Sequence, residues 1–144
     1  MPEQTTSTIE IDATPDQVMA VIVDFEDYPA WVQGMKRVEV VQRAADGRAE
    51  QVHFDLDAGV KDSYTLAYDY ADEHTLRWHL VDGKLMRAMD GTYEVAATGT
   101  GTHVTYRLAV DLAIPMIGML RRKAEKVIID TALKGLKKRV ESLG

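Results

Sequence analysis

Several aromatic side chains that carry a polar group are spaced so that each falls on the apolar side of a predicted strand. Strict alternation of apolar and polar residues is typical of a half-buried strand. A buried phenol or indole needs a hydrogen-bond partner, which either the core or a cavity holding water or a ligand can supply. Core filling and the lining of a binding cavity are therefore both open for these residues: Tyr64, Tyr68, Trp78, Tyr93 and Tyr106.

Arg121 has the most unusual predicted position among the charged residues. At 3.6 residues per turn it falls within the apolar arc of the C-terminal helix, close to Ile117 and Ile128. A guanidinium in that arc must reach solvent, pair with an acid such as Asp111 or Glu94, or bind the anionic group of a ligand. All of these outcomes are compatible with the sequence.

Metal binding and nucleophilic catalysis find little support. His53 and His79 lie on the polar sides of predicted strands, where neighbouring strands would let them form a metal site with Asp55 or Asp57. A solvated face of mixed charge is the other interpretation. The chain has no cysteine, no His-Glu-x-x-His pattern, no glycine-rich phosphate loop and no Gly-x-Ser-x-Gly pattern. We therefore predict no metal site, no cofactor and no catalytic residue.

Residues 121–139 form a strongly basic segment. Eight lysines and arginines stand against Glu125 and Asp130, so the segment carries +6 and the rest of the chain −12. Such a segment can dock on an anionic membrane surface, a nucleic acid or an acidic partner, and it is also typical of a solvated helix face. Because the whole chain is acidic, with a net charge of −6, we expect no nucleic-acid binding and at most weak membrane-surface contact.

The elements that must position these residues follow the order strand, short helix, several strands, long helix. Residues 8–12 alternate and predict a first strand, and Thr14 with Gln17 forms the capping box of the following helix. Pro29 predicts a break or a second short helix. Between residues 38 and 112, about six alternating segments separated by short turns are typical of an antiparallel meander.

The longest predicted helix runs from Pro115 to about Ser142. Such a helix must bury its apolar stripe against the sheet, which is the only large partner available. Helical geometry assigns these residues to the stripe: Ile117, Leu120, Ala124, Val127, Ile128, Thr131 and Gly135, with Leu136, Val140 and Leu143 continuing it at a drifting angle. It places these residues on the opposite side: Lys123, Lys126, Lys134 and Lys137.

Length and composition indicate one globular domain covering residues 1–144. Of the 144 residues, 46% are hydrophobic and 28% charged, so the chain can bury a sizeable core without disulfides. No segment has the pattern of a signal peptide, and no run approaches the roughly 18 apolar residues of a membrane span. We expect a cytoplasmic protein that is a monomer or a dimer.

Three stretches resemble a known superfamily. They are residues 11–18 with the pattern apolar-x-Ala-x-Pro-x-x-Val, residues 24–31 with a Tyr-Pro pair before a tryptophan, and residues 91–106 with Gly-Thr-Tyr and Gly-Thr-His. With the order of elements, they resemble the START-like superfamily, in particular its polyketide cyclase/dehydrase and lipid-transport group and its coenzyme Q-binding (SRPBCC) members. Small uncharacterised actinobacterial proteins are similar. The resemblance implies an α+β helix-grip fold: a curved antiparallel sheet of about six or seven strands wrapped around a long C-terminal helix, with short helices after the first strand.

The same resemblance implies a cavity between sheet and helix for a hydrophobic or amphipathic small molecule, such as a lipid or a polyketide-like compound. We therefore expect a binding or transport protein rather than an enzyme. The alternatives are a polyketide cyclase or aromatase that uses pocket tyrosines or an arginine, and a docking protein that uses its basic helix. The residues predicted to line the cavity are Trp31, Met35, Phe54, Leu56, Tyr64, Tyr68, Trp78, Met89, Tyr93, Tyr106, Leu120, Arg121, Ala124, Ile128 and Thr131.

Overall fold

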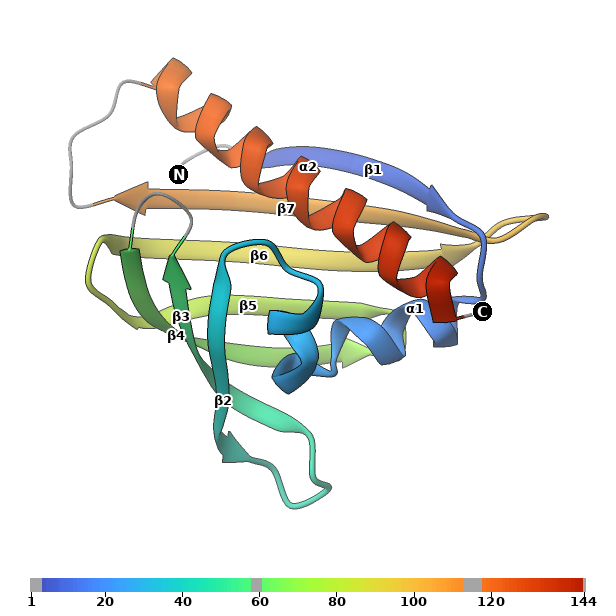
Figure 1. Ribbon diagram of the computed structural model, residues 1–144, viewed down its shortest axis with the longest axis horizontal. Coiled ribbons are helices and arrows are strands. Elements are labelled where there is room, and N and C mark those ends of the chain that lie inside the picture. Colours follow the sequence, from blue (N-terminus) through green and yellow to red (C-terminus); the bar gives the residue numbers. More distant parts are fainter. Residues whose placement is uncertain (1–3, 58–60, 113–117, 144) are drawn as a thin grey trace.

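A curved antiparallel sheet carries one long helix across its concave face (Figure 1). The computed structural model describes residues 4–57, 61–112 and 118–143. Its elements are β1 (Thr5–Ile11), α1 (Pro15–Ile22), the 3₁₀ helix η1 (Phe25–Ala30), β2 (Met35–Arg43), β3 (Ala49–Asp57), β4 (Lys61–Asp72), β5 (Thr75–Gly83), β6 (Met86–Ala97), β7 (Thr102–Leu112) and α2 (Gly118–Leu143). The predicted helix-grip architecture is confirmed.

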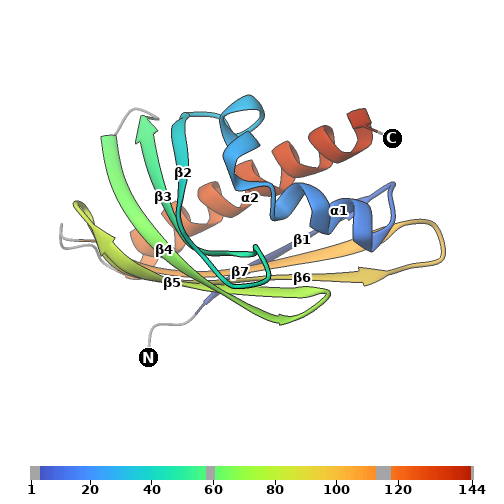
Figure 2. The ribbon, with the colours of Figure 1, turned by 90° about the horizontal axis from the view of Figure 1, so that it is seen from below.

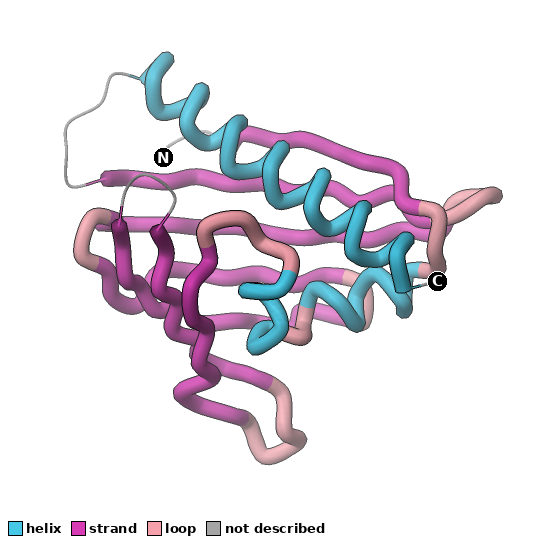
Figure 3. The backbone as a smooth tube through the Cα atoms, in the orientation of Figure 1, coloured by secondary structure: helices cyan, strands magenta, loops and turns pink. Residues whose placement is uncertain are grey.

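The seven strands are ordered β1-β7-β6-β5-β4-β3-β2, and all paired neighbours are antiparallel. Strands β2 to β7 form the predicted meander, and β1 pairs with β7 to complete one edge. Figure 2 shows how β2, β3 and β4 curl toward the side that carries the helices. In Figure 3 the helices α1, η1 and α2 lie over the same face of the sheet.

The passage from β1 into α1 follows the predicted capping box. The Thr14 hydroxyl accepts a hydrogen bond from the Gln17 N–H at 3.2 Å, and the Gln17 side-chain oxygen accepts one from the Thr14 N–H at 2.9 Å. Two backbone donors of the first turn are thereby satisfied. The helix ends at Ile22, and η1 is the predicted second short helix that contains Pro29.

The turn between β6 and β7 packs against the end of β1. A Cβ at Gly101 would lie 2.4 Å from the Ile11 carbonyl oxygen, so only glycine fits this approach. The next residue, Thr102, is fully buried, and its hydroxyl donates to the Ala13 carbonyl at 2.6 Å. This contact joins the Gly-Thr pair of the β6–β7 turn to the Ile-Asp-Ala passage after β1.

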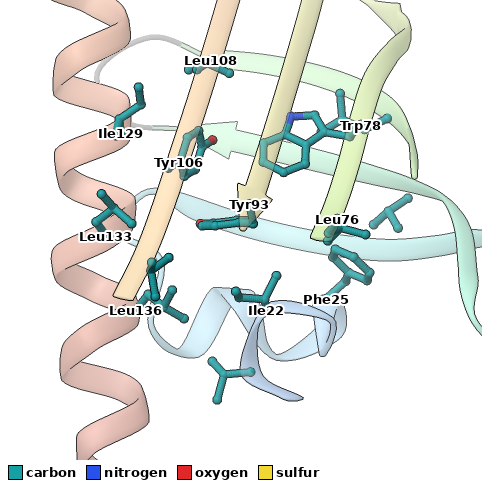
Figure 4. Packing of buried hydrophobic residues seen from close by; sticks show 14 of the residues in the cluster. Ile22, Phe25, Leu76, Trp78, Tyr93, Tyr106, Leu108, Ile129, Leu133 and Leu136 are labelled. Atoms are coloured by element: carbon teal, nitrogen blue, oxygen red, sulfur yellow. The ribbon is translucent and has the colours of Figure 1, made fainter. Parts of the chain in front are cut away.

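Helix α2 packs against β1, β7 and α1. Its buried side consists of Ile129, Leu133, Leu136 and Val140, all at most 3% exposed. These side chains meet the inward residues of the sheet to form the core (Figure 4). The predicted start of this helix at Pro115 lies outside the described residues.

The predicted apolar stripe of α2 is correct at Leu136 and Val140, which are buried, and wrong in the turns before them, where Ile129 and not Ile128 faces the core. Val127 and Ile128 are 60% and 42% exposed, and Thr131 is exposed as well. The buried stripe instead includes Glu125, whose carboxylate accepts one hydrogen bond from the Thr5 hydroxyl and one from the Val110 N–H, each at 2.7 Å. Because a charged residue occupies one of its positions, the buried stripe does not show the regular apolar spacing of an amphipathic helix in the sequence.

Candidate ligand-binding site

A continuous group of aromatic rings lies between the sheet and the helices. Figure 4 shows part of it, with Phe25, Trp78, Tyr93 and Tyr106 in the space enclosed by the sheet, α1 and α2. Neighbouring ring centroids are 4.5 to 6.2 Å apart. We call these residues the aromatic cluster: Phe25, Tyr28, Trp31, Phe54, Tyr64, Tyr68, Trp78, Tyr93 and Tyr106.

The strand register brings the sheet members of the cluster together. Because side chains alternate between the faces of a strand, residues paired across neighbouring strands share one face. The aromatic pairs are Phe54 with Tyr64, Tyr68 with Trp78, and Tyr93 with Tyr106. The predicted placement on the apolar sides of strands is correct, since Tyr68 is half-buried and the other five are buried.

Gly91 makes room for the Trp78 indole. The two residues are directly paired between β5 and β6, and a Cβ at Gly91 would lie only 2.2 Å from indole carbons. The indole ring therefore packs directly against the backbone of β6 at Gly91, which has no side chain. Tyr93 and Tyr106 bound it on the other sides, with centroids 5.4 Å away.

The cluster contains one fully buried hydrogen-bond donor that lacks a partner. Within the described residues, the buried side-chain nitrogen and oxygen atoms without a partner are the Trp31 Nε1 and, on the neighbouring helix α2, the Arg139 Nε. The Tyr28 hydroxyl donates to the Ile22 carbonyl. The hydroxyl groups of Tyr64, Tyr68, Tyr93 and Tyr106 are not among the buried atoms without a partner. Unpaired donors in an apolar interior are unusual, because burial normally requires a hydrogen bond.

Burial keeps these phenols protonated. It raises the pKa of Tyr28, Tyr68, Tyr93 and Tyr106 well above the ordinary value. Burial also raises the pKa of Tyr64, and the nearby Asp62 carboxylate adds to that effect. The cluster therefore presents neutral hydroxyl groups that donate hydrogen bonds, rather than phenolates.

Helix η1 closes one side of the cluster against α2. The Trp31 ring lies against Gly135, where a Cβ would be 3.5 Å from a ring carbon. Nearby, Arg139 of α2 donates to the Asp27 carboxylate at 2.8 Å. The small residue and the ion pair let the two helices approach closely with the indole between them.

The remaining residues predicted to line a cavity lie in different environments. Met35 and Met89 are buried, and Leu56, Ala124 and Arg121 are half-buried. Ile128 and Thr131 are exposed, which contradicts their predicted inward position and follows from the shifted helix stripe.

Two further predictions concern residues of α2. The side chain of Leu120 lies outside what the structure describes. Glu94, suggested as a partner of Arg121, accepts instead from Arg107.

Polar residues on the convex face of the sheet form a local network. His53 contacts the Thr65 hydroxyl at 3.0 Å and the Asp55 carboxylate at 3.2 Å, and Ser63 donates to that carboxylate at 2.7 Å. The Ser63 hydroxyl thus donates to a carboxylate, and within the described residues it forms no hydrogen bond with a histidine that could act as its base. His53 and His79 are not neighbours, because β4 separates their strands, and the described residues contain no group suited to a metal ion.

Two surface pockets open elsewhere on the molecule. One of about 300 Å³ lies beside the β3–β4 hairpin and includes Leu56 and Asp62. The other, of about 650 Å³, lies between α1, β2 and the β4–β5 turn, and Phe25 forms part of its wall. The cluster tyrosines are not among the residues that line either pocket. In the described part of the chain, no helix has the length and apolar character needed to cross a membrane.

Solved structures of similar shape come from several bacteria. A START superfamily protein from Mycobacterium smegmatis has a TM-score of 0.94 at 24% identity, with 99% of each chain covered. A protein from Thermus thermophilus has a TM-score of 0.82 at 24% identity over 98% and 99% of the chains. The Zhui aromatase/cyclase from Streptomyces sp. R1128 has a TM-score of 0.73 at 15% identity over 96% and 93% of the chains. Similarity at this level of identity shows a common fold.

Sequence comparison gives the family. No protein with a curated description matches the chain in sequence. Residues 2–141, almost the entire chain, match the profile of the family described as polyketide cyclase / dehydrase and lipid transport. The chain therefore belongs to the polyketide cyclase/dehydrase and lipid transport family.

Proposed function

We propose that the chain binds an oxygen-bearing aromatic or polyketide-like small molecule among the aromatic cluster, between the sheet, η1 and α2. The observation that carries this proposal is the buried Trp31 indole Nε1, which has no hydrogen-bond partner within the described residues and lies in a cluster of protonated phenols. Leaving one such group unsatisfied costs about 1–3 kcal/mol. A ligand with carbonyl or hydroxyl oxygens would satisfy this donor while its rings contact the cluster.

The chemistry of the lining favours an aromatic ligand over a saturated chain. Aromatic rings gain from offset or edge-to-face contact with other rings, beyond the burial of their surface. A saturated acyl chain offers no acceptor along its length to the hydroxyls of Tyr93 and Tyr106. Because the raised pKa values keep the phenols neutral, the preferred ligand groups are hydrogen-bond acceptors.

A cyclase is the second candidate, supported by the family and by the fold shared with an aromatase/cyclase. Interior phenols can polarise a carbonyl of a substrate by hydrogen bonding. Carbon–carbon ring closure also requires a base to remove a proton next to a carbonyl. The buried carboxylates of Asp62 and Glu125 already accept hydrogen bonds from backbone amides. Within the described residues the interior thus offers donors without a free base, which favours binding.

Tryptophan fluorescence tests this proposal, because both tryptophans of the chain belong to the cluster. We expect 1,8-dihydroxyanthraquinone to quench the emission saturably and dodecanoate to bind more weakly. The double variant Tyr93→Phe/Tyr106→Phe should lose about tenfold in affinity for the anthraquinone, since each lost hydrogen bond contributes about 0.5–1.5 kcal/mol.

The matched control is Tyr70→Phe. Its hydroxyl already donates to the Ala49 carbonyl at 2.8 Å, so its removal should leave affinity for the anthraquinone unchanged. Absence of saturable quenching would refute the proposal. Equal affinity of the double variant and the wild type would show that the hydroxyls do not contact the ligand.

A further inference from the structure

Helix α2 carries exposed aliphatic residues as well as basic ones. Val127 is 60% exposed, Ile128 42% and Met119 71%. These are large values for apolar side chains on a helix packed along a sheet. Five basic residues of the same helix form no ion pair within the described part of the chain: Arg121, Arg122, Lys123, Lys134 and Lys138.

Helical geometry places the key residues on one arc. At about 100° per residue, Val127, Lys123, Lys134 and Lys138 fall within about 60° of one another. This arc is opposite the buried stripe that contains Leu136. An aliphatic residue therefore stands in the middle of three lysines on the outermost line of the helix.

The acids of this segment offset the arc only in part. Glu125 is 1% exposed and faces inward, where it accepts the hydrogen bonds from β1 and β7. Asp130 pairs with Lys126 at 3.1 Å on the flank next to β1, and the hydrogen bond from Lys126, and after it the charge of Lys134, lower the pKa of the Asp130 carboxyl. The arc holds three lysines of a segment that carries +6, in a chain whose net charge is −6.

We propose that this arc, which we call the α2 docking face (Val127, Lys123, Lys134 and Lys138), binds the surface of an anionic lipid bilayer. The lysines would contact the headgroups and Val127 would insert between them, as in helices that lie in the membrane interface. A nucleic acid offers phosphates without an apolar layer beneath them, so it gives the exposed aliphatic side chains no favourable contact. The inference depends on α2 alone and holds whether or not the interior binds a ligand.

Docking in this orientation has a geometric consequence. Ile128 and Gly135 are seven residues apart and therefore lie on the same side of α2. Gly135 contacts Trp31, so this side faces η1 and the edge of the aromatic cluster. This side lies about 100° around the helix from Val127, so a bilayer at the docking face would flank that edge without covering it.

Vesicle co-sedimentation of the full chain tests the proposal. We expect binding to phosphatidylcholine vesicles that contain phosphatidylserine, weaker binding as salt rises, and little binding to phosphatidylcholine alone. Each lysine near such a surface contributes about fivefold in affinity, so Lys123→Gln/Lys134→Gln/Lys138→Gln should lose at least about tenfold. Val127→Ser should lose about fivefold through lost apolar burial.

Matched controls come from the opposite parts of the molecule. Lys36→Gln/Lys61→Gln/Lys84→Gln makes the same charge change at exposed lysines away from α2, and Val81→Ser removes a valine that is 49% exposed on β5. Both controls should bind vesicles like the wild type. The anthraquinone titration without vesicles should be unchanged in all α2 variants, which separates this proposal from the ligand proposal.

Three results would overturn the inference. The first is the absence of binding to anionic vesicles at low salt. The second is an equal loss of vesicle affinity in the α2 triple variant and in its control. The third is an unchanged vesicle affinity of Val127→Ser together with equally strong binding of a DNA duplex. The last result would identify a purely electrostatic polyanion surface.

Discussion

Gly91→Ala should disturb the centre of the aromatic cluster. The new Cβ would lie 2.2 Å from carbons of the Trp78 indole, whereas carbon atoms in contact are about 3.5–4.0 Å apart. The indole must therefore move by more than about 1 Å, although Trp78 is only 6% exposed and is bounded by Tyr93 and Tyr106. Overpacking of this kind costs about 1–3 kcal/mol in the free energy of unfolding.

Urea unfolding followed by tryptophan fluorescence measures this cost, and Gly99→Ala is the control because nothing lies within 4 Å of its Cβ position. In a Trp78→Leu background the clash is removed, so Gly91→Ala should then cost less than about 0.5 kcal/mol, a coupling that a double-mutant cycle reveals. If Gly91→Ala is as stable as Gly99→Ala and its fluorescence is unaltered, the described indole position is incorrect.

Three further predictions concern burial and charge. Glu125→Ala should lower the free energy of unfolding by about 3 kcal/mol, because it leaves the Val110 N–H unpaired. The control Glu73→Ala removes an exposed carboxylate and should change the free energy of unfolding by less than about 0.5 kcal/mol. Urea unfolding measures both variants, and equal effects would contradict the buried hydrogen bonds of Glu125. The pKa of each of the six tyrosines is raised in the folded protein. Their burial therefore contributes fully to the free energy of unfolding at any pH below 10.0, the ordinary pKa of tyrosine. This contribution is lost as the pH rises from 10.0 toward the higher pKa values of the folded state. Phenolate absorbance should therefore appear together with unfolding; early titration of several tyrosines in the folded protein would disprove their burial. Zn²⁺ should not raise the melting temperature, since the described residues offer no metal group, and a stabilisation abolished by His53→Ala would show otherwise.

The sequence predicts the strands and the first helix well because their signals are local. The capping box of Thr14 and Gln17 depends only on residues within one turn, and it forms as expected. The aromatic residues alternate with polar ones, so their common face follows from the period of a strand. Their ring contacts depend on the register between strands, which the sequence does not specify.

The errors come from long-range contacts. The sequence misplaces the inward face in the first turns of α2 because Glu125 has its partners in Thr5 and Val110, far away in the sequence. The role of Gly91 likewise becomes visible only when β5 and β6 are paired and Trp78 lies across it. Composition and the spacing of apolar residues do not predict the environment of a residue whose contacts are far away in the sequence.

The central claim is that a ligand accepts hydrogen bonds from interior donors, and the indole N–H signals report on it directly. The chain has two tryptophans, so a ¹H–¹⁵N spectrum contains two indole signals, one of them from the buried and unpartnered Nε1 of Trp31. Addition of 1,8-dihydroxyanthraquinone should shift the Trp31 signal downfield and saturate at one equivalent. A probe that binds while both indole signals stay in place would contradict the account.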